Sequence, residues 1–155
     1  MVDLADLISA DAIVHRIKAS QKHQAILEMA EVAVKAYGVD LTTIVESTLE
    51  RERLGGTGVG DGVAIPHARI KGLSAPMAVL GIVDPAIDFD APDGRGADII
   101  VLLLSPEDAG ADHLKALARI SRLLRRAEIR DGIRAARSAG AIHAFTCGNA
   151  TSVAA

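Results

Sequence analysis

The sequence predicts an α/β fold: a single domain with a mixed central β-sheet and helices packed on both faces. The length of 155 residues suits one domain. Segments rich in apolar and β-branched residues alternate with segments whose apolar residues recur at helical spacing. Residues 97–104 form an almost continuous apolar run, which is typical of a central strand buried on both faces. We therefore expect residues 1–155 to form one domain.

The first part of the chain predicts a strand followed by a helix. Residues 2–8 indicate a short helical lead-in, and the β-branched residues within 12–18 favour a strand. Residues 21–37 carry an apolar stripe at helical spacing. Ser20 is the expected N-cap of this helix, and Gly38 is the expected left-handed residue that ends it.

A second helix and a glycine-rich segment come next. Asp40 is expected to cap a helix over residues 41–54, so that the two helices form a hairpin with a short joint. Residues 55–62 hold five glycines, and we therefore expect no regular element there. A short strand over residues 62–65 then leads into Pro66.

The rest of the chain predicts two longer strands and two helices. They are expected, in that order, at residues 75–83, 97–104, 108–127 and 128–138. Ser105-Pro106 is expected to end the second strand, and Gly140 and a short tail follow the last helix.

Composition and charge exclude several classes of protein. Hydrophobic residues make up 50% and charged residues 24%, which excludes a disordered chain, and the longest apolar run, residues 99–104, is far too short to span a bilayer. The N-terminus lacks a signal-peptide pattern, and the single cysteine, Cys147, excludes an intrachain disulfide. A net charge of −3 and an aromatic content of 2% argue against nucleic-acid binding. We expect a cytoplasmic protein with no membrane insertion and no nucleic-acid partner.

Residues 51–69 carry the candidate chemistry. Glycines allow backbone N–H groups to approach an anion, and Arg51 offers a planar set of donors suited to phosphoryl oxygens. Thr57 adds a hydroxyl donor. Pro66 stiffens the chain just before His67, whose neutral imidazole is a nucleophile near neutral pH. Together these residue types suit the handling of a phosphoryl group.

Other phosphate and metal motifs do not fit. The segment lacks the lysine of a P-loop and the third glycine of a dinucleotide-binding fingerprint. A zinc site formed by His67, His113 and a carboxylate would lack the short ligand spacing of known zinc motifs. We therefore expect neither a metal nor a cofactor.

Three motifs resemble a known family. Residues 62–68, Gly-Val-Ala-Ile-Pro-His-Ala, resemble the phosphorylation-site motif of the fructose- and mannitol-type enzyme IIA domains of the bacterial phosphotransferase system. Residues 51–60 are most similar to the nitrogen-related branch of these domains. Ser105-Pro106 followed by His113-Leu114 resembles the later helix that brings a second histidine to the family's site. The similarity covers most of the chain.

This resemblance implies a phosphoryl carrier. His67 would accept phosphate through Nε2 from an HPr-like phosphocarrier, and the protein would act mainly as a nitrogen-related regulatory enzyme IIA. His113 and Arg51 would assist at the catalytic site. The residues expected to bind the phosphate are Thr57, Gly58 and Gly60. Downstream partners would be regulatory targets such as a sensor kinase or potassium transport proteins. A IIA component of a fructose/mannitol-type sugar transporter and a non-covalent phosphometabolite-binding module are the alternative functions.

Each site residue also has a purely structural interpretation. His67 would be an ordinary turn histidine, His113 a solvated residue of a first helical turn, and Arg51 part of a surface charge cluster. Thr57 would only satisfy a loop amide. Residues 115–137 hold eight basic and two acidic residues, a formal charge of +6, which leaves −9 for the rest of a chain whose total is −3. This basic segment is either a solvated helix face or a surface for an acidic partner.

Overall fold

A six-stranded mixed sheet forms the centre of the computed structural model, which describes residues 4–147. The strands are β1 (Ile13–Ile17), β2 (Gly58–Gly60), β3 (Val63–Ala64), β4 (His67–Ile70), β5 (Met77–Ile87) and β6 (Ala97–Pro106). Their order is β1-β5-β6-β3-β2, and β4 pairs with β6 beyond the end of β3. β5 is antiparallel to β6, whereas β3 and β4 are parallel to it. Every residue of β6 except Asp98 is buried, which confirms the predicted central strand.

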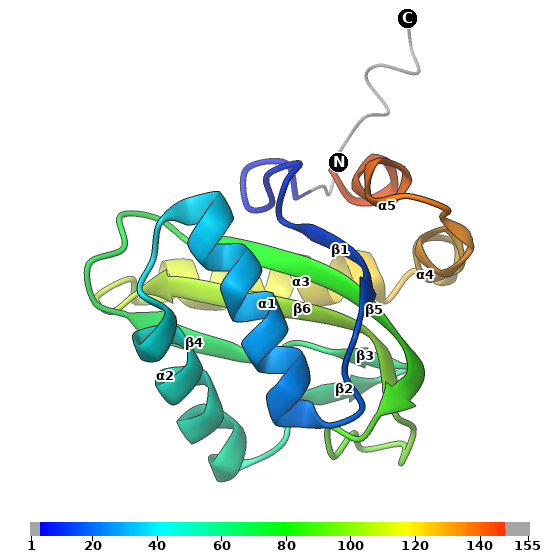
Figure 1. The fold of residues 1–155 in the computed structure, drawn as a ribbon, viewed down its shortest axis with the longest axis horizontal. Coiled ribbons are helices and arrows are strands. Elements are labelled where there is room, and N and C mark those ends of the chain that lie inside the picture. The colour runs from blue at the N-terminus through cyan, green and yellow to red at the C-terminus, as the bar shows by residue number, and fades with distance from the viewer. Residues whose placement is uncertain (1–3, 148–155) are drawn as a thin grey trace, which may run out of the picture.

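Helices cover both faces of this sheet. Within the described residues they are α1 (Lys22–Tyr37), α2 (Leu41–Leu54), α3 (Ala111–Leu124), α4 (Ala127–Ala135) and α5 (Ala139–Thr146). Figure 1 shows α1 and α2 in front of the sheet and α3 behind it. α4 and α5 pack together, and α5 contacts β1. The predicted fold class is therefore confirmed. No helix within residues 4–147 is long and apolar enough to cross a membrane.

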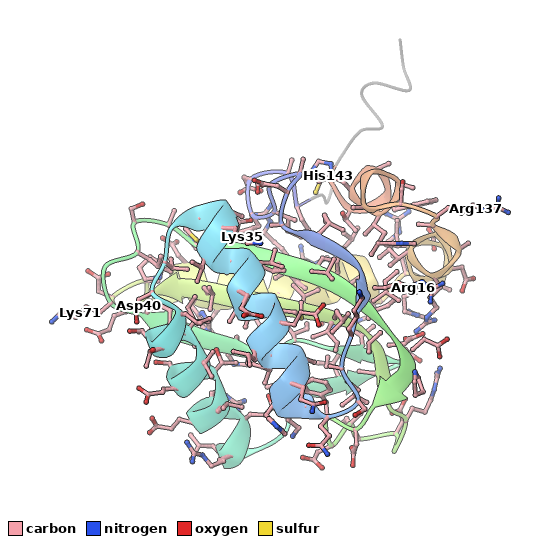
Figure 2. All side chains as sticks on the ribbon, viewed as in Figure 1. Arg16, Lys35, Asp40, Lys71, Arg137 and His143 are labelled. Atoms are coloured by element: carbon pink, nitrogen blue, oxygen red, sulfur yellow. The ribbon has the colours of Figure 1, made fainter. Side chains whose placement is uncertain are left out.

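The α1–α2 hairpin follows its predicted end signals closely. Gly38 ends α1 in the left-handed region, at φ 73°. Asp40 caps α2 by accepting the N–H of Thr43 at 2.9 Å, and Figure 2 shows Asp40 at the start of that helix. The prediction that Ser20 caps α1 is wrong, because Gln21 is still extended and occupies the N-cap position one residue later.

Several other boundaries predicted from the sequence are wrong. Residues 4–8 form a hydrogen-bonded turn instead of a helix, and residues 2–3 lie outside the described range. Gly58–Gly60 forms β2 despite its glycine content, because β3 supplies a pairing partner. β5 continues to Ile87, which pairs with the start of β6. Residues 105–106 belong to β6 because β4 pairs with them.

The sequence does not predict β4 or α5. α5 occupies the stretch expected to be a tail, and Ser138 caps it by accepting the N–H of Ala141 at 3.1 Å. The helix expected from residue 108 begins at Ala111, after Gly110 with a φ of 56°. It ends at Leu124, before a separate α4.

Candidate functional site

β3 and β4 hold His67 at one edge of the sheet. Both strands pair with β6, β3 opposite Ile99 and Ile100 and β4 from Leu103 onward. Between the two strands, the carbonyl of Pro66 accepts the N–H of Leu103 at 2.9 Å. Pro66 has no backbone N–H to donate, but its carbonyl keeps this segment hydrogen-bonded to β6. His67 is consequently presented from a stiff support.

The half-buried ring of His67 has a defined tautomer. Its Nδ1 lies 2.8 Å from the carbonyl oxygen of Ile65, and because a carbonyl only accepts hydrogen bonds, Nδ1 carries the proton. Burial lowers the pKa of His67, and so do the charges of Arg51 and Arg69, although the Ile65 hydrogen bond and Glu52 oppose this. The ring is therefore neutral near pH 7, and the lone pair of Nε2 is not used by the Ile65 contact.

His113 is buried beside His67. It is the third residue of α3, and the two ring centroids lie 5.3 Å apart with the ring planes at 49°. Only 5% of His113 is exposed. The interpretation of His113 as a solvated first-turn residue is therefore wrong, because its ring contacts His67 and is hydrogen-bonded to the buried Ser105.

Ser105 fixes the proton position on His113. Its Oγ lies 2.6 Å from Nδ1 of His113, and within residues 4–147 it has no other hydrogen-bond partner. Ser105 is fully buried, and a buried hydroxyl without an acceptor costs about 1–3 kcal/mol. The O–H therefore donates to Nδ1, which leaves the ring proton on Nε2. Burial, together with the charges of His67 and Arg69, lowers the pKa of His113 to about 4, so this ring is also neutral near pH 7.

Two arginines lie close to the histidine pair. Arg51, in the last turn of α2, donates from Nη1 to the carbonyl of Gly55 at 2.8 Å, and its charge lowers the pKa of His67. Arg69 lowers the pKa of both histidines. Arg69 was not among the residues predicted for the site. It lies two residues after His67 on β4, so both side chains lie on the same side of that strand. Strand periodicity is the signal that would have found it.

Two of the three residues expected to bind phosphate have donors engaged elsewhere. The hydroxyl of Thr57 donates to the buried carboxylate of Glu52 at 2.6 Å, and the N–H of Gly58 donates to Phe89 at 2.9 Å. Gly60 lies beside Ser121 and Arg125 in a small cavity of about 100 Å³, roughly two helical turns along α3 from His113. The structure therefore brings His67 and His113 into contact and places Arg51 close enough for its charge to lower the pKa of His67. Phosphate binding by Thr57, Gly58 and Gly60 stays a prediction.

Two other features considered from the sequence are a metal site and the basic segment of residues 115–137. Among residues 4–147, no three His, Cys, Asp or Glu side chains gather as a metal ion would need. Four arginines of the basic segment form ion pairs: Arg119 with Asp6, Arg126 with Glu128, Arg130 with Asp61 and Arg134 with Asp98. Arg137 projects from the surface in Figure 2. These ion pairs favour the interpretation of the basic segment as a solvated helix face.

Comparison with known proteins places this site in a family. A family model described as "Phosphoenolpyruvate-dependent sugar phosphotransferase system, EIIA 2" matches residues 6–146. The chain is 45% identical over 140 residues to a nitrogen regulatory protein of Bradyrhizobium diazoefficiens, which covers 90% of this chain and 92% of that protein. It is 35% identical over 144 residues to a nitrogen regulatory protein of Pseudomonas aeruginosa, which covers 92% of this chain and 94% of that protein.

A solved structure shows the same fold. The crystal structure of nitrogen regulatory protein IIA-Ntr from Neisseria meningitidis matches with a TM-score of 0.84 at 28% identity, over 92% of this chain and 97% of that chain. The sequence and structural matches agree with each other and span nearly the whole chain. The chain therefore belongs to the EIIA 2 family of the phosphoenolpyruvate-dependent sugar phosphotransferase system.

Proposed function

We propose that this protein is a phosphoryl carrier that accepts phosphate on Nε2 of His67 from an HPr-like phosphocarrier. The hydrogen bond from Nδ1 of His67 to Ile65 carries this proposal, because it leaves Nε2 unprotonated in a neutral ring. His113, with its ring centroid 5.3 Å from that of His67, supplies a second polar ring at the site.

The transfer needs no proton movement at His67. The Nε2 lone pair forms the new N–P bond while the N–P bond of the carrier phosphohistidine breaks, and the carrier imidazole leaves with the electron pair of that bond. Nδ1 of His67 keeps its proton and continues to donate it to the Ile65 carbonyl. Because the His67 ring becomes more positive as the bond forms, this hydrogen bond strengthens in the transition state.

Neighbouring groups compensate the charge on the transferring phosphoryl group. Nε2–H of His113 is the donor that Ser105 leaves available, and it would donate to an equatorial phosphoryl oxygen. Arg51 and Arg69 supply positive charge near His67. The N-terminus of α3, where His113 lies, adds the positive end of a helix dipole.

Two apolar side chains beside the site support docking of a protein carrier. Leu54 ends α2 three residues after Arg51 and is 83% exposed, and Leu114 directly follows His113 and is 63% exposed. Exposed apolar surface of this kind is used for protein binding where it forms a contiguous patch. An HPr-like partner could therefore cover His67 while its own phosphohistidine reaches Nε2.

The curated relatives favour a regulatory role over sugar transport. The two reported above are nitrogen regulatory proteins, each matched over more than nine tenths of its length, whereas two fructose-specific PTS components match at the lower identities of 34% and 32%. We infer that the protein acts in the cytoplasm as a nitrogen-related enzyme IIA, whose phosphorylation state is read by downstream proteins such as a sensor kinase or potassium transport proteins.

Labelling with a complete phosphorelay tests the proposal. The protein is incubated with an enzyme I, an HPr-like carrier and phosphoenolpyruvate, and intact-mass and peptide analysis then locate any added phosphoryl group. We expect one acid-labile, base-stable group on His67, no label in His67→Ala, and normal label in His23→Ala, a matched control at an exposed histidine of α1.

The same incubation separates the competing function. A His67→Ala variant labelled as well as the wild type would refute the assignment. If the protein takes up no phosphoryl group but shows thermal stabilisation by phosphorylated metabolites or nucleotides, a non-covalent binding module is correct instead.

A further inference from the structure

A buried carboxylate lies next to the site in sequence and is not explained by the transfer chemistry. Glu52 follows Arg51 at the end of α2, and its side chain is only 3% exposed. Burying a carboxylate is costly unless it is paired and hydrogen-bonded. Glu52 meets both conditions: Oε2 accepts the N–H of Thr57 at 2.8 Å, Oε1 accepts its hydroxyl at 2.6 Å, and Nζ of Lys22 lies 3.2 Å from Oε2.

Thr57 connects this carboxylate to the reacting ring. The carbonyl of Thr57 accepts the N–H of Ile65 at 3.0 Å, and the carbonyl of Ile65 accepts Nδ1–H of His67 at 2.8 Å. Glu52 is thus joined to His67 by a series of hydrogen bonds through Thr57, just before β2, and Ile65, between β3 and β4. From this geometry we propose that Glu52 is a positioning residue, which holds Ile65 through Thr57 and thereby orients His67 for phosphoryl transfer.

Charge around the ring gives Glu52 a second influence on His67. Arg51 and Arg69 lower the pKa of His67, as burial does, whereas the negative charge of Glu52 raises it. His113 is neutral near pH 7 and contributes no full charge there. The imidazole gains positive charge during the attack, so a nearby carboxylate favours the transition state more than the ground state.

Lys22 pairs with the buried carboxylate of Glu52. Nζ of Lys22 lies between Glu52 and the exposed carboxylate of Asp90, at 3.2 and 3.3 Å, and approaches the ring of Phe89 at 5.5 Å from its centroid. Lys22 belongs to α1, Glu52 belongs to α2, and Thr57 lies in the loop before β2. This arrangement joins the helical layer to the strand that supports His67.

This role rests on the proposed phosphoryl transfer, so the test includes a measurement that does not depend on it. Glu52→Gln keeps the shape of the side chain but removes its charge. The control is Glu50→Gln, which removes a negative charge from an exposed position of the same helix. NMR titration of the unphosphorylated proteins gives the pKa and tautomer of His67, and rapid quench with a phosphorylated HPr-like carrier gives the maximal transfer rate and the half-saturating carrier concentration.

We expect Glu52→Gln to lower the pKa of His67 and to reduce the maximal transfer rate roughly 10-fold to 100-fold, the range known for groups that orient metal-binding histidines. The half-saturating carrier concentration should stay unchanged, because Glu52 is buried and does not touch the carrier. Glu50→Gln should change none of these quantities. A second pair of variants leaves the Glu52 carboxylate in place and changes Thr57. Thr57→Val should slow transfer, whereas Thr57→Ser, which retains the hydroxyl, should stay near the wild-type rate.

Two results would overturn the proposal. The first is a folded Glu52→Gln protein in which His67 titrates as in the wild type, whatever its transfer rate, since a purely structural residue would leave that pKa unchanged. The second is equal transfer rates in Thr57→Val and Thr57→Ser, which decides the matter even where Glu52→Gln does not fold. Failure of His67 to accept phosphate in the wild type would instead refute the proposed function, and the titration would still test Glu52.

Discussion

Mild acid should destabilise this protein through His113. The pKa of this buried histidine falls from an ordinary 6.5 to about 4 in the folded state. Between pH 6.5 and about 4, His113 therefore binds a proton in the unfolded chain but not in the folded protein. The free energy of unfolding consequently decreases as the pH falls from 6.5 toward 4. A shift of this size corresponds to about 3 kcal/mol of unfolding free energy. The pKa of His67 is also lowered, so it acts in the same direction.

A matched variant isolates this contribution. His113→Asn removes the titrating ring, and its Oδ1 can still accept the hydroxyl of Ser105. Urea unfolding followed by circular dichroism gives the unfolding free energy of both proteins between pH 4 and pH 7.5. The wild type should lose about 3 kcal/mol more than the variant over this range. Carboxylates with a lowered pKa, such as Asp6 beside Arg119, are present in both proteins and cancel in the difference.

Parallel stability curves for the wild type and His113→Asn would refute this reasoning. They would mean that His113 titrates at the same pH in the folded and unfolded states, and hence that neither its burial nor the charges of His67 and Arg69 perturb it. A direct NMR titration of the folded wild type provides an independent check, since the ring of His113 should remain neutral down to about pH 4.

Three further changes have expected outcomes. Ser105→Ala removes the donor that fixes the tautomer of His113, so rapid-quench measurements should show slower transfer to a His67 that is still labelled, and the unpaired Nδ1 should cost about 1–3 kcal/mol in urea unfolding. Arg69→Gln removes a positive charge that acts on both rings, so the pKa values of His67 and His113 should rise in NMR titrations. Gly58→Ala would place a Cβ 2.8 Å from that of Ala91, and the resulting shift in the strand should lower stability by about 1–3 kcal/mol in urea unfolding.

Local signals explain what the sequence predicted well. Asp40 caps α2 through an N–H three residues ahead, and Gly38 ends α1 because it alone tolerates a φ of 73° at low cost. The continuous apolar run of β6 predicted a strand buried on both faces, as the structure shows. Pro66 restricts its own φ and the conformation of the residue before it, so the sequence alone predicts a stiff backbone just before His67.

Pairing between distant segments explains what the sequence did not predict. β2 exists because Gly58 and Gly60 meet Ala64 and Val63, and glycine content alone gives no sign of that partner. Thr57 was expected to face the phosphate, but the adjacent turn brings it onto Glu52. Glu52 lies within a run of charged residues, a pattern typical of the surface. Its burial depends on the pairing with Lys22 of α1, which the sequence does not indicate.

The tautomers of the two histidines separate their roles. Ile65 presents a carbonyl, which can only accept, so His67 is protonated on Nδ1 and its Nε2 is a nucleophile. Ser105 presents a hydroxyl that has to donate, so His113 is protonated on Nε2 and that nitrogen is a donor. In the proposed transfer, the atom that each Nδ1 contacts would thus make one of these two identical side chains the phosphate acceptor and the other a donor to the phosphate. His113 is for this reason a poor substitute for a missing His67, and it should stay unlabelled in the His67→Ala variant.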